Sequence, residues 1–127
     1  QKEVAERIVS KKDKKSYGRL SILAQWRLEC EILFNIKPSC FYPVPKVEST
    51  LVKFTPKRNF IKIKNIKNLE KITSLFFNQR RKKIKNVIKS LISKSNITDN
   101  ISVDLNLRPQ NLSPDFYYNM VKIIESN

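Results

Sequence analysis

The sequence has no histidine and a single glycine, Gly18, among its 127 residues. Without histidine, the chain lacks the commonest general base of enzymes and the commonest nitrogen ligand of metals. With one glycine, it cannot form a glycine-rich loop that wraps a phosphate or a nucleotide. Glu29 and Glu31 share one face of a predicted strand, but no partner carboxylate is predicted beside them. These residues alone argue against a self-sufficient enzyme.

Cysteines and long apolar runs are also scarce. Cys30 and Cys40 do not have the spacing of metal ligands, and two isolated thiols fit a reducing cytosol better than a disulfide scaffold. No apolar run approaches the ~20 residues of a membrane span, and no signal peptide opens the chain. We therefore expect a cytoplasmic location and no membrane partner. Because the first residue is Gln1 and not methionine, we also expect a fragment of a longer protein.

Positive charge, in contrast, is abundant and unevenly placed. Twenty-six Lys and Arg residues against eleven Asp and Glu residues give a net charge of +15. Residues 57–94 hold thirteen of these cations and one acid, a net of +12, whereas residues 1–56 hold a net of +5 and residues 95–127 a net of −2. An AT-rich coding bias would explain many lysines as merely solvated, but it would not confine the excess to one third of the chain. A polyanionic partner is the better interpretation.

The hydrophobic pattern predicts an α/β part followed by a helical part. Residues 2–10 and 17–25 have apolar residues at helical spacing. Residues 28–36 alternate as a strand does, and residues 47–54 are rich in β-branched and aromatic residues. Helix, helix, strand, loop and strand in this order predict the closing portion of an α/β domain over residues 1–56.

The remainder, residues 57–127, is predicted to be a mostly helical second domain. We place the boundary at residues 56–59, followed by a short extended link at residues 60–64. The other predicted features are helices at 68–78 and 82–93, a break near Gln79, and a last helix that has Ser113 as its N-cap and Pro114 in its first turn.

An aromatic residue stands on a proline-rich loop. Residues 41–47 read Phe-Tyr-Pro-Val-Pro-Lys-Val, and Pro38, Pro43 and Pro45 restrict the backbone around Phe41. An aromatic side chain held in this way could stack on an unpaired base for ~1–3 kcal/mol. The local sequence leaves open the alternative that Phe41 packs beneath the loop as an ordinary apolar residue.

A cationic run begins inside an apolar pattern at residues 76–83, Phe-Phe-Asn-Gln-Arg-Arg-Lys-Lys. On a helix, Lys82, Lys85 and Lys89 would share one face, opposite an apolar one. Because neighbouring cations repel one another, a bound anion is favoured over a solvated helix face. Arginine binds phosphate bidentately and lysine as a point charge, so the run suits an RNA backbone. Its members are Arg80, Arg81, Lys82, Lys83, Lys85 and Lys89.

Together, these stretches resemble the bacterial small-subunit rRNA adenine dimethyltransferases of the KsgA/RsmA type. The resemblance spans nearly the whole chain but only the back part of the family. The family's glycine-rich S-adenosylmethionine loop and its Asn-Leu-Pro-Tyr motif should lie upstream of Gln1, and neither occurs here. The matching stretches are residues 1–8, 17–21 with 24–25, 38–49 and 77–82, and the tail from Leu107 to the final helix is also similar.

The resemblance implies the last helices and strands of a Rossmann-like methyltransferase domain, followed by a small all-helical domain. It implies transfer of methyl groups from S-adenosylmethionine to N6 of two adjacent adenines near the 3′ end of small-subunit rRNA. Phe41 matches an aromatic that helps to sandwich the flipped adenine, and the family's Pro-Pro-Pro-Lys is residues 43–46 here, with Val44 at the middle proline. The run at Arg80–Lys83 matches the family's rRNA-contacting surface. Lys46 is a further expected RNA contact, and Arg19 is a weaker one that could instead serve domain packing.

Two functional hypotheses remain open from the sequence. In the first, the chain supplies rRNA binding and part of the target-base pocket, is monomeric, contacts the 30S particle, and by itself binds no S-adenosylmethionine and is inactive. In the second, the chain is a stand-alone basic rRNA- or ribosome-binding protein without catalysis. A related enzyme alternative is a large-subunit rRNA methyltransferase that confers antibiotic resistance, but the Asn-Gln-Arg-Arg-Lys cluster favours the small-subunit type.

Overall fold

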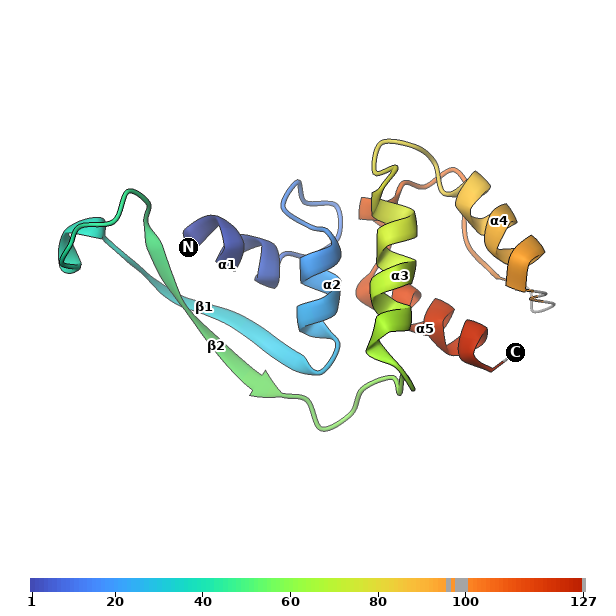
Figure 1. Ribbon diagram of the computed structural model, residues 1–127, viewed down its shortest axis with the longest axis horizontal. Helices are drawn as coiled ribbons and strands as arrows, with labels where there is room; N and C mark the ends of the chain where they lie inside the picture. Colours follow the sequence, from blue (N-terminus) through green and yellow to red (C-terminus); the bar gives the residue numbers. More distant parts are fainter. Residues whose placement is uncertain (96, 98–100, 127) are drawn as a thin grey trace.

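The computed structural model describes residues 1–95, 97 and 101–126. Figure 1 shows an elongated arrangement in which a long β-hairpin extends to one side, α1 and α2 lie beside it, and α3, α4 and α5 form the other side. The elements are α1 (Lys2–Val9), α2 (Arg19–Gln25), β1 (Leu28–Ile36), the 3₁₀ turn η1 (Pro38–Cys40), β2 (Ser49–Pro56), α3 (Ile66–Phe77), α4 (Lys85–Ser95), the 3₁₀ turn η2 (Pro109–Asn111) and α5 (Pro114–Glu125).

Strands β1 and β2 form an antiparallel hairpin, which is the whole sheet of the described residues. The pairing runs from Leu28 opposite Pro56 to Ile36 opposite Ser49, and it shifts by one residue between Ile32 and Phe34. A bulge of this kind changes which face later side chains point to. The strand at 28–36 was predicted correctly. Half-buried and exposed residues alternate only as far as Ile32, and Phe34 is 56% exposed.

Helix α2 begins two residues later than the predicted start at Tyr17. The Gly18 N–H donates to Ser21 Oγ at 3.1 Å, which fixes the first turn, and helix α2 starts at Arg19. Tyr17 is fully buried just outside the helix, and its hydroxyl donates to the Leu112 carbonyl at 2.7 Å. Tyr17 is therefore buried by a contact with a distant part of the chain, and it is not part of helix α2.

Helix α4 begins at Lys85, so the prediction that Lys82 lies on the same helical face as Lys85 and Lys89 is wrong. The Lys82 N–H instead closes a turn on the Gln79 carbonyl, at 3.0 Å. The Ile84 N–H donates to the Leu107 carbonyl at 2.9 Å, which draws the chain toward the core before the helix starts. The predicted break near Gln79 is confirmed.

The last helix has the predicted Pro114 in its first turn, while Ser113 occupies the N-cap position without a side-chain cap bond. At the other end of this helix, the Glu125 carboxylate accepts hydrogen bonds from Lys64 N at 2.8 Å and Asn65 N at 3.0 Å, so it covers the start of α3. Burial disfavours the charged form of Glu125, but these hydrogen bonds outweigh it and lower the pKa of the carboxyl. Helices α3 and α5 are thereby joined at their ends.

One core is shared by the two parts of the chain. Tyr17 and Ile22, which precede the hairpin, are fully buried in the same cluster as Leu69 of α3 and Tyr117 of α5. The Tyr118 hydroxyl donates to the Ile22 carbonyl. The boundary at residues 56–59 stays a prediction, and across it α2 packs directly on the helical part. No helix of the described residues is long and apolar enough to cross a membrane.

Candidate nucleic-acid interface

The cationic run lies mainly on the segment between α3 and α4, residues 78–84, and its two arginines have different surroundings. Arg80 is half-buried, and its Nη2 donates to the Lys15 carbonyl at 2.8 Å. Its guanidinium also lies 5.8 Å from the ring centroid of Phe77. A Cβ on Gly18 would lie 3.3 Å from Arg80 Nη1, so the glycine leaves room for this approach. Arg80 therefore holds the segment in place.

The other cations of the run point to solvent. Arg108 Nε donates to the Arg81 carbonyl at 2.9 Å and so fixes the backbone of the segment from its second side. The side chains that this arrangement leaves exposed, without a hydrogen bond or ion pair to another described residue, are those of Arg81, Lys82, Lys83, Lys85 and Lys89. These five exposed cations carry positive charge that no described acid neutralises, and positive charge of this kind is what attracts phosphates.

A second set of lysines lies beside this surface, and the sequence pattern did not reveal it. The loop between α1 and α2 reads Lys11-Lys-Asp-Lys-Lys15, and it appeared only as a polar loop. The hydrogen bond from Arg80 to the Lys15 carbonyl brings it against the run across 65 residues of sequence. Periodicity along the chain could not have predicted that these two segments lie together, because the contact joins residues far apart in sequence.

Arg19 is engaged with a neighbouring helix. Its Nη2 donates to the Glu70 carbonyl on α3 at 3.2 Å, so the side chain links α2 to α3 although it is exposed. This contact supports the packing alternative for Arg19, and a direct RNA contact stays a prediction.

The predicted base-stacking loop lies at the tip of the hairpin. The Phe41 N–H donates to the Pro38 carbonyl at 3.1 Å, which closes η1, and the Phe41 side chain is 40% exposed and lies outside the buried core. Tyr42 is 99% exposed, so it is a second aromatic that this loop presents. Lys46 is also exposed. Figure 1 places this tip at the far end of the molecule from α3 and α4, so the structure does not bring Phe41 and the cationic run together.

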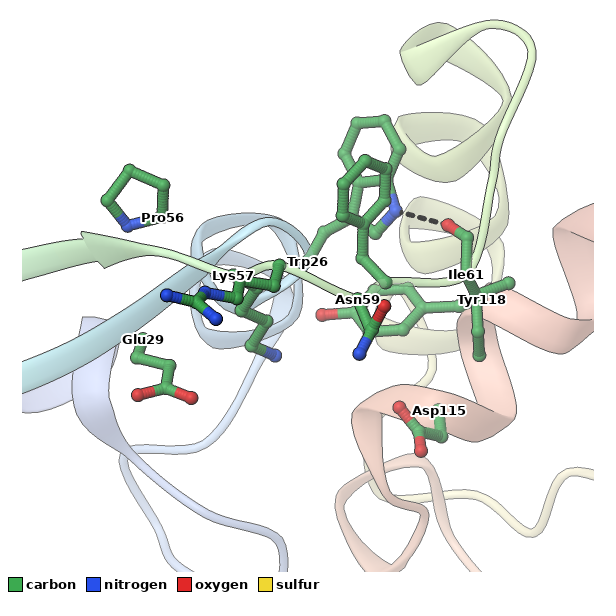
Figure 2. A pocket seen from close by; sticks show the side chains of 10 residues that line it. Trp26, Glu29, Pro56, Lys57, Asn59, Ile61, Asp115 and Tyr118 are labelled. Atoms are coloured by element: carbon green, nitrogen blue, oxygen red, sulfur yellow. Dashed lines mark hydrogen bonds between the residues drawn. The ribbon is translucent and has the colours of Figure 1, made fainter.

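A cavity of about 720 Å³ lies where the chain leaves β2 (Figure 2). Trp26 Nε1 donates to the Ile61 carbonyl at 2.7 Å, and Lys57 Nζ donates to the Gln25 carbonyl at 2.6 Å. The Arg27 guanidinium lies 4.5 Å from the Phe60 ring centroid. Each of these side chains already has a partner in the chain. Together, the three contacts hold the link between β2 and α3 against the end of α2.

Nearly the whole chain also matches a known family. A sequence profile described as "Ribosomal RNA adenine dimethylase" matches residues 1–126. The chain belongs to this family. The resemblance predicted from the sequence is thereby confirmed at the level of the family.

Curated relatives of this chain carry the name "Ribosomal RNA small subunit methyltransferase A". The protein from Pelagibacter ubique (strain HTCC1062) is 50% identical over 126 residues, which are 98% of this chain and 48% of the relative. The protein from Francisella tularensis subsp. novicida (strain U112) is 44% identical over 114 residues, which are 89% of this chain and 44% of the relative. The chain thus spans about half the length of the curated relatives it matches.

Two solved structures are similar to the chain in fold. A dimethyladenosine transferase from Plasmodium falciparum superposes with a TM-score of 0.77 at 22% identity, over 98% of this chain and 55% of that one. The 23S rRNA methyltransferase ErmE gives a TM-score of 0.51 at 17% identity, over 98% of this chain and 52% of that one. Five helices and a two-stranded sheet are the part of a methyltransferase fold that the described residues form.

Proposed function

We propose that this chain is the substrate-reading portion of an rRNA adenine N6,N6-dimethyltransferase that acts on two adjacent adenines near the 3′ end of small-subunit rRNA. The observation that carries the proposal is the 50% identity, over 98% of the chain, to a small-subunit rRNA methyltransferase. The exposed cations of the run support it, because they suit a phosphate backbone and not a small neutral substrate. The 30S particle, a monomeric state and a cytoplasmic location belong to the same proposal.

The methyl donor belongs to the complete enzyme. S-adenosylmethionine would supply an electrophilic methyl group for adenine N6, but the residues of this chain do not fit a site for it. The chain's one glycine, Gly18, faces the Arg80 guanidinium, and no glycine-rich turn accompanies it. This chain's own contributions are RNA binding and base positioning.

We assign residues 1–56 to the closing portion of the methyltransferase domain. The hairpin supports this assignment because its two strands expose large apolar side chains, and no other strand of the described residues pairs with their outer edges. An isolated two-stranded hairpin is at best marginally stable, and open edges are normally paired or covered. The remaining half of the enzyme would cover these side chains, which include Leu33, Phe34, Leu51 and Phe54.

We assign residues 57–127 to a helical rRNA-binding domain, with a division of labour between it and the hairpin tip. The exposed cations on residues 81–89 would hold phosphates. Phe41, at the other end of the molecule (Figure 1), would stack on the adenine only after it leaves the helix. Unstacking a base costs about a few kcal/mol, and stacking on an aromatic ring offsets part of that cost.

A hybrid enzyme tests the proposal. The part of the Pelagibacter relative that lies outside the matched stretch would be joined to this chain, and methyl transfer to small-subunit particles and to large-subunit RNA would be measured. We expect dimethylated adenines in the small-subunit RNA, and weaker particle binding when Arg81, Lys82 and Lys83 are replaced by Ala. Methylation of large-subunit RNA alone would contradict the proposal. A folded hybrid that binds particles without methylating them would favour the stand-alone binding alternative.

A further inference from the structure

We infer that the lysine-rich loop between α1 and α2, residues 11–15, is a second phosphate-binding site for RNA, continuous with the exposed cations of the run. The inference rests on the proposed rRNA-binding function and extends its interface to a segment outside the predicted RNA contacts. All five residues of the lysine-rich loop are exposed, and four of them are lysines.

The lysine-rich loop and the cationic run form one continuous edge. The carbonyl of Lys15 accepts the 2.8 Å hydrogen bond from Arg80, the first cation of the run. Figure 1 shows this loop and the α3–α4 connection along the same upper edge of the molecule. An RNA strand that crosses Arg81 and Lys82 would therefore meet the lysine-rich loop next.

The lysine-rich loop is held in one conformation by groups other than its lysine side chains. The Asp13 N–H donates to the Gln110 carbonyl at 2.8 Å, and Asn111 Nδ2 donates to Asp13 Oδ1 at 2.9 Å. Asp13 has φ of 72°, a left-handed conformation that Asp tolerates better than most residues. Because the backbone is already ordered, binding a partner costs less conformational entropy.

The same contacts separate the lysines from negative charge. The carboxylate of Asp13, the acid of the loop, is turned toward the Asn111 amide. The ion pairs among the described residues, Lys2–Glu48 and Arg7–Glu3, involve none of the lysines of the loop. Four ammonium groups so placed repel one another, and a row of phosphates relieves that repulsion. Lysine suits this partner because it contacts phosphate as a point charge, with little demand on geometry.

The test replaces Lys11, Lys12, Lys14 and Lys15 with Gln in the complete hybrid enzyme and measures binding to small-subunit RNA from 50 to 300 mM salt. If all four contact phosphates, the log–log salt slope becomes shallower by about 3, at roughly 0.7–0.9 per contact. The melting temperature should not fall, since the hydrogen bonds that fix the loop use backbone atoms, Asp13 and Asn111, and the loss of four like charges only relieves repulsion.

A matched variant removes the same charge elsewhere. Lys37, Lys53, Lys62 and Lys67 are exposed and make no side-chain hydrogen bond or ion pair to another described residue. Their replacement by Gln should change the slope by less than the loop variant does. Equal slopes for the two variants, or an unchanged slope for the loop variant, would overturn the inference.

The variant with Ala at Arg81, Lys82 and Lys83, measured in parallel, separates this inference from the proposed function. If that variant loses affinity while the loop variant keeps the full slope, the lysine-rich loop is not a contact but the interface stands. If neither variant changes RNA binding, the proposed rRNA-binding surface itself is wrong.

Discussion

At the scale of single residues, Arg80 and Arg81 are neighbours in sequence with opposite surroundings. The Arg80 guanidinium is occupied by the Lys15 carbonyl and by Phe77, whereas the Arg81 side chain is exposed and its backbone carbonyl is held by Arg108. The first side chain contributes to the shape of the surface and the second to its charge. Substitutions at the two positions should therefore have different effects.

Arg80→Ala should lower the free energy of unfolding by about 1–2 kcal/mol, because a charge-assisted hydrogen bond is lost at a half-buried site. Arg81→Ala should leave the stability within about 0.5 kcal/mol and weaken RNA binding directly. Denaturant unfolding and RNA binding measured on both variants check the prediction. Equal stability losses at the two positions would mean that the Lys15 contact contributes nothing specific.

Phe41→Ala, made in the complete enzyme, should slow methyl transfer about ten- to a hundredfold, from a stacking energy of ~1–3 kcal/mol. Affinity for ribosomal particles and the melting temperature should hardly change, because Phe41 is exposed and lies outside the core. Phe41→Tyr and Phe41→Trp, which keep an aromatic face, serve as controls and should retain most activity. A large drop in melting temperature in Phe41→Ala would show instead that Phe41 packs as an ordinary apolar residue.

At the scale of elements, three buried tyrosines tie α5 and its neighbours together. Tyr17, Tyr117 and Tyr118 donate to the carbonyls of Leu112, Pro109 and Ile22, respectively. Burial raises the pKa of all three hydroxyls above the ordinary value near 10. The folded state therefore keeps these protons at a pH where the unfolded chain releases them, and alkali should destabilise the fold.

The free energy of unfolding should not depend on the ionisation of these tyrosines below about pH 10, and it should fall above that pH by up to about 1.4 kcal/mol per pH unit for each tyrosine. Tyr117→Phe removes one such group. The variant should be less stable than the wild type at pH 8, because it loses a buried hydrogen bond, and the difference should shrink toward pH 11. Denaturant unfolding at each pH measures this difference, and lysine titration affects both proteins alike. A difference that stays constant with pH would contradict the assignment.

Elements with a local cause could be predicted from the sequence. The alternation from Leu28 to Ile36 marked β1, and Pro114 marked the start of α5. The start of α4 could not be predicted in the same way. The backbone hydrogen bond from Ile84 N–H to the Leu107 carbonyl, which precedes the helix, joins residues far apart in sequence. The lysine-rich loop was missed for the same reason: its partner Arg80 lies 65 residues away from Lys15. The hydrophobic periodicity of a sequence predicts local helices and strands, but it does not predict contacts between residues far apart in the chain.

At the scale of the whole molecule, this chain alone should bind S-adenosylmethionine negligibly while it binds RNA. The chain has neither the glycine-rich turn nor the acidic ribose ligand that such a cofactor site requires. Calorimetry on the isolated chain checks the first expectation, and a cooperative thermal transition of the same preparation shows that the protein is folded. Stoichiometric cofactor binding at micromolar concentration would contradict the division of roles proposed above.

The contacts of α5 also affect when the molecule can fold during its synthesis. The Tyr118 hydroxyl reaches the Ile22 carbonyl across 96 residues, and Glu125 covers the start of α3 across 60. A growing polypeptide leaves the ribosome amino end first, so α2 and α3 emerge while their packing partner is still untranslated. The cationic edge, held through Tyr17 and Arg108, cannot assemble until then. We therefore expect the cationic edge to form late during synthesis, only after α5 has been made and can pack on α2 and α3.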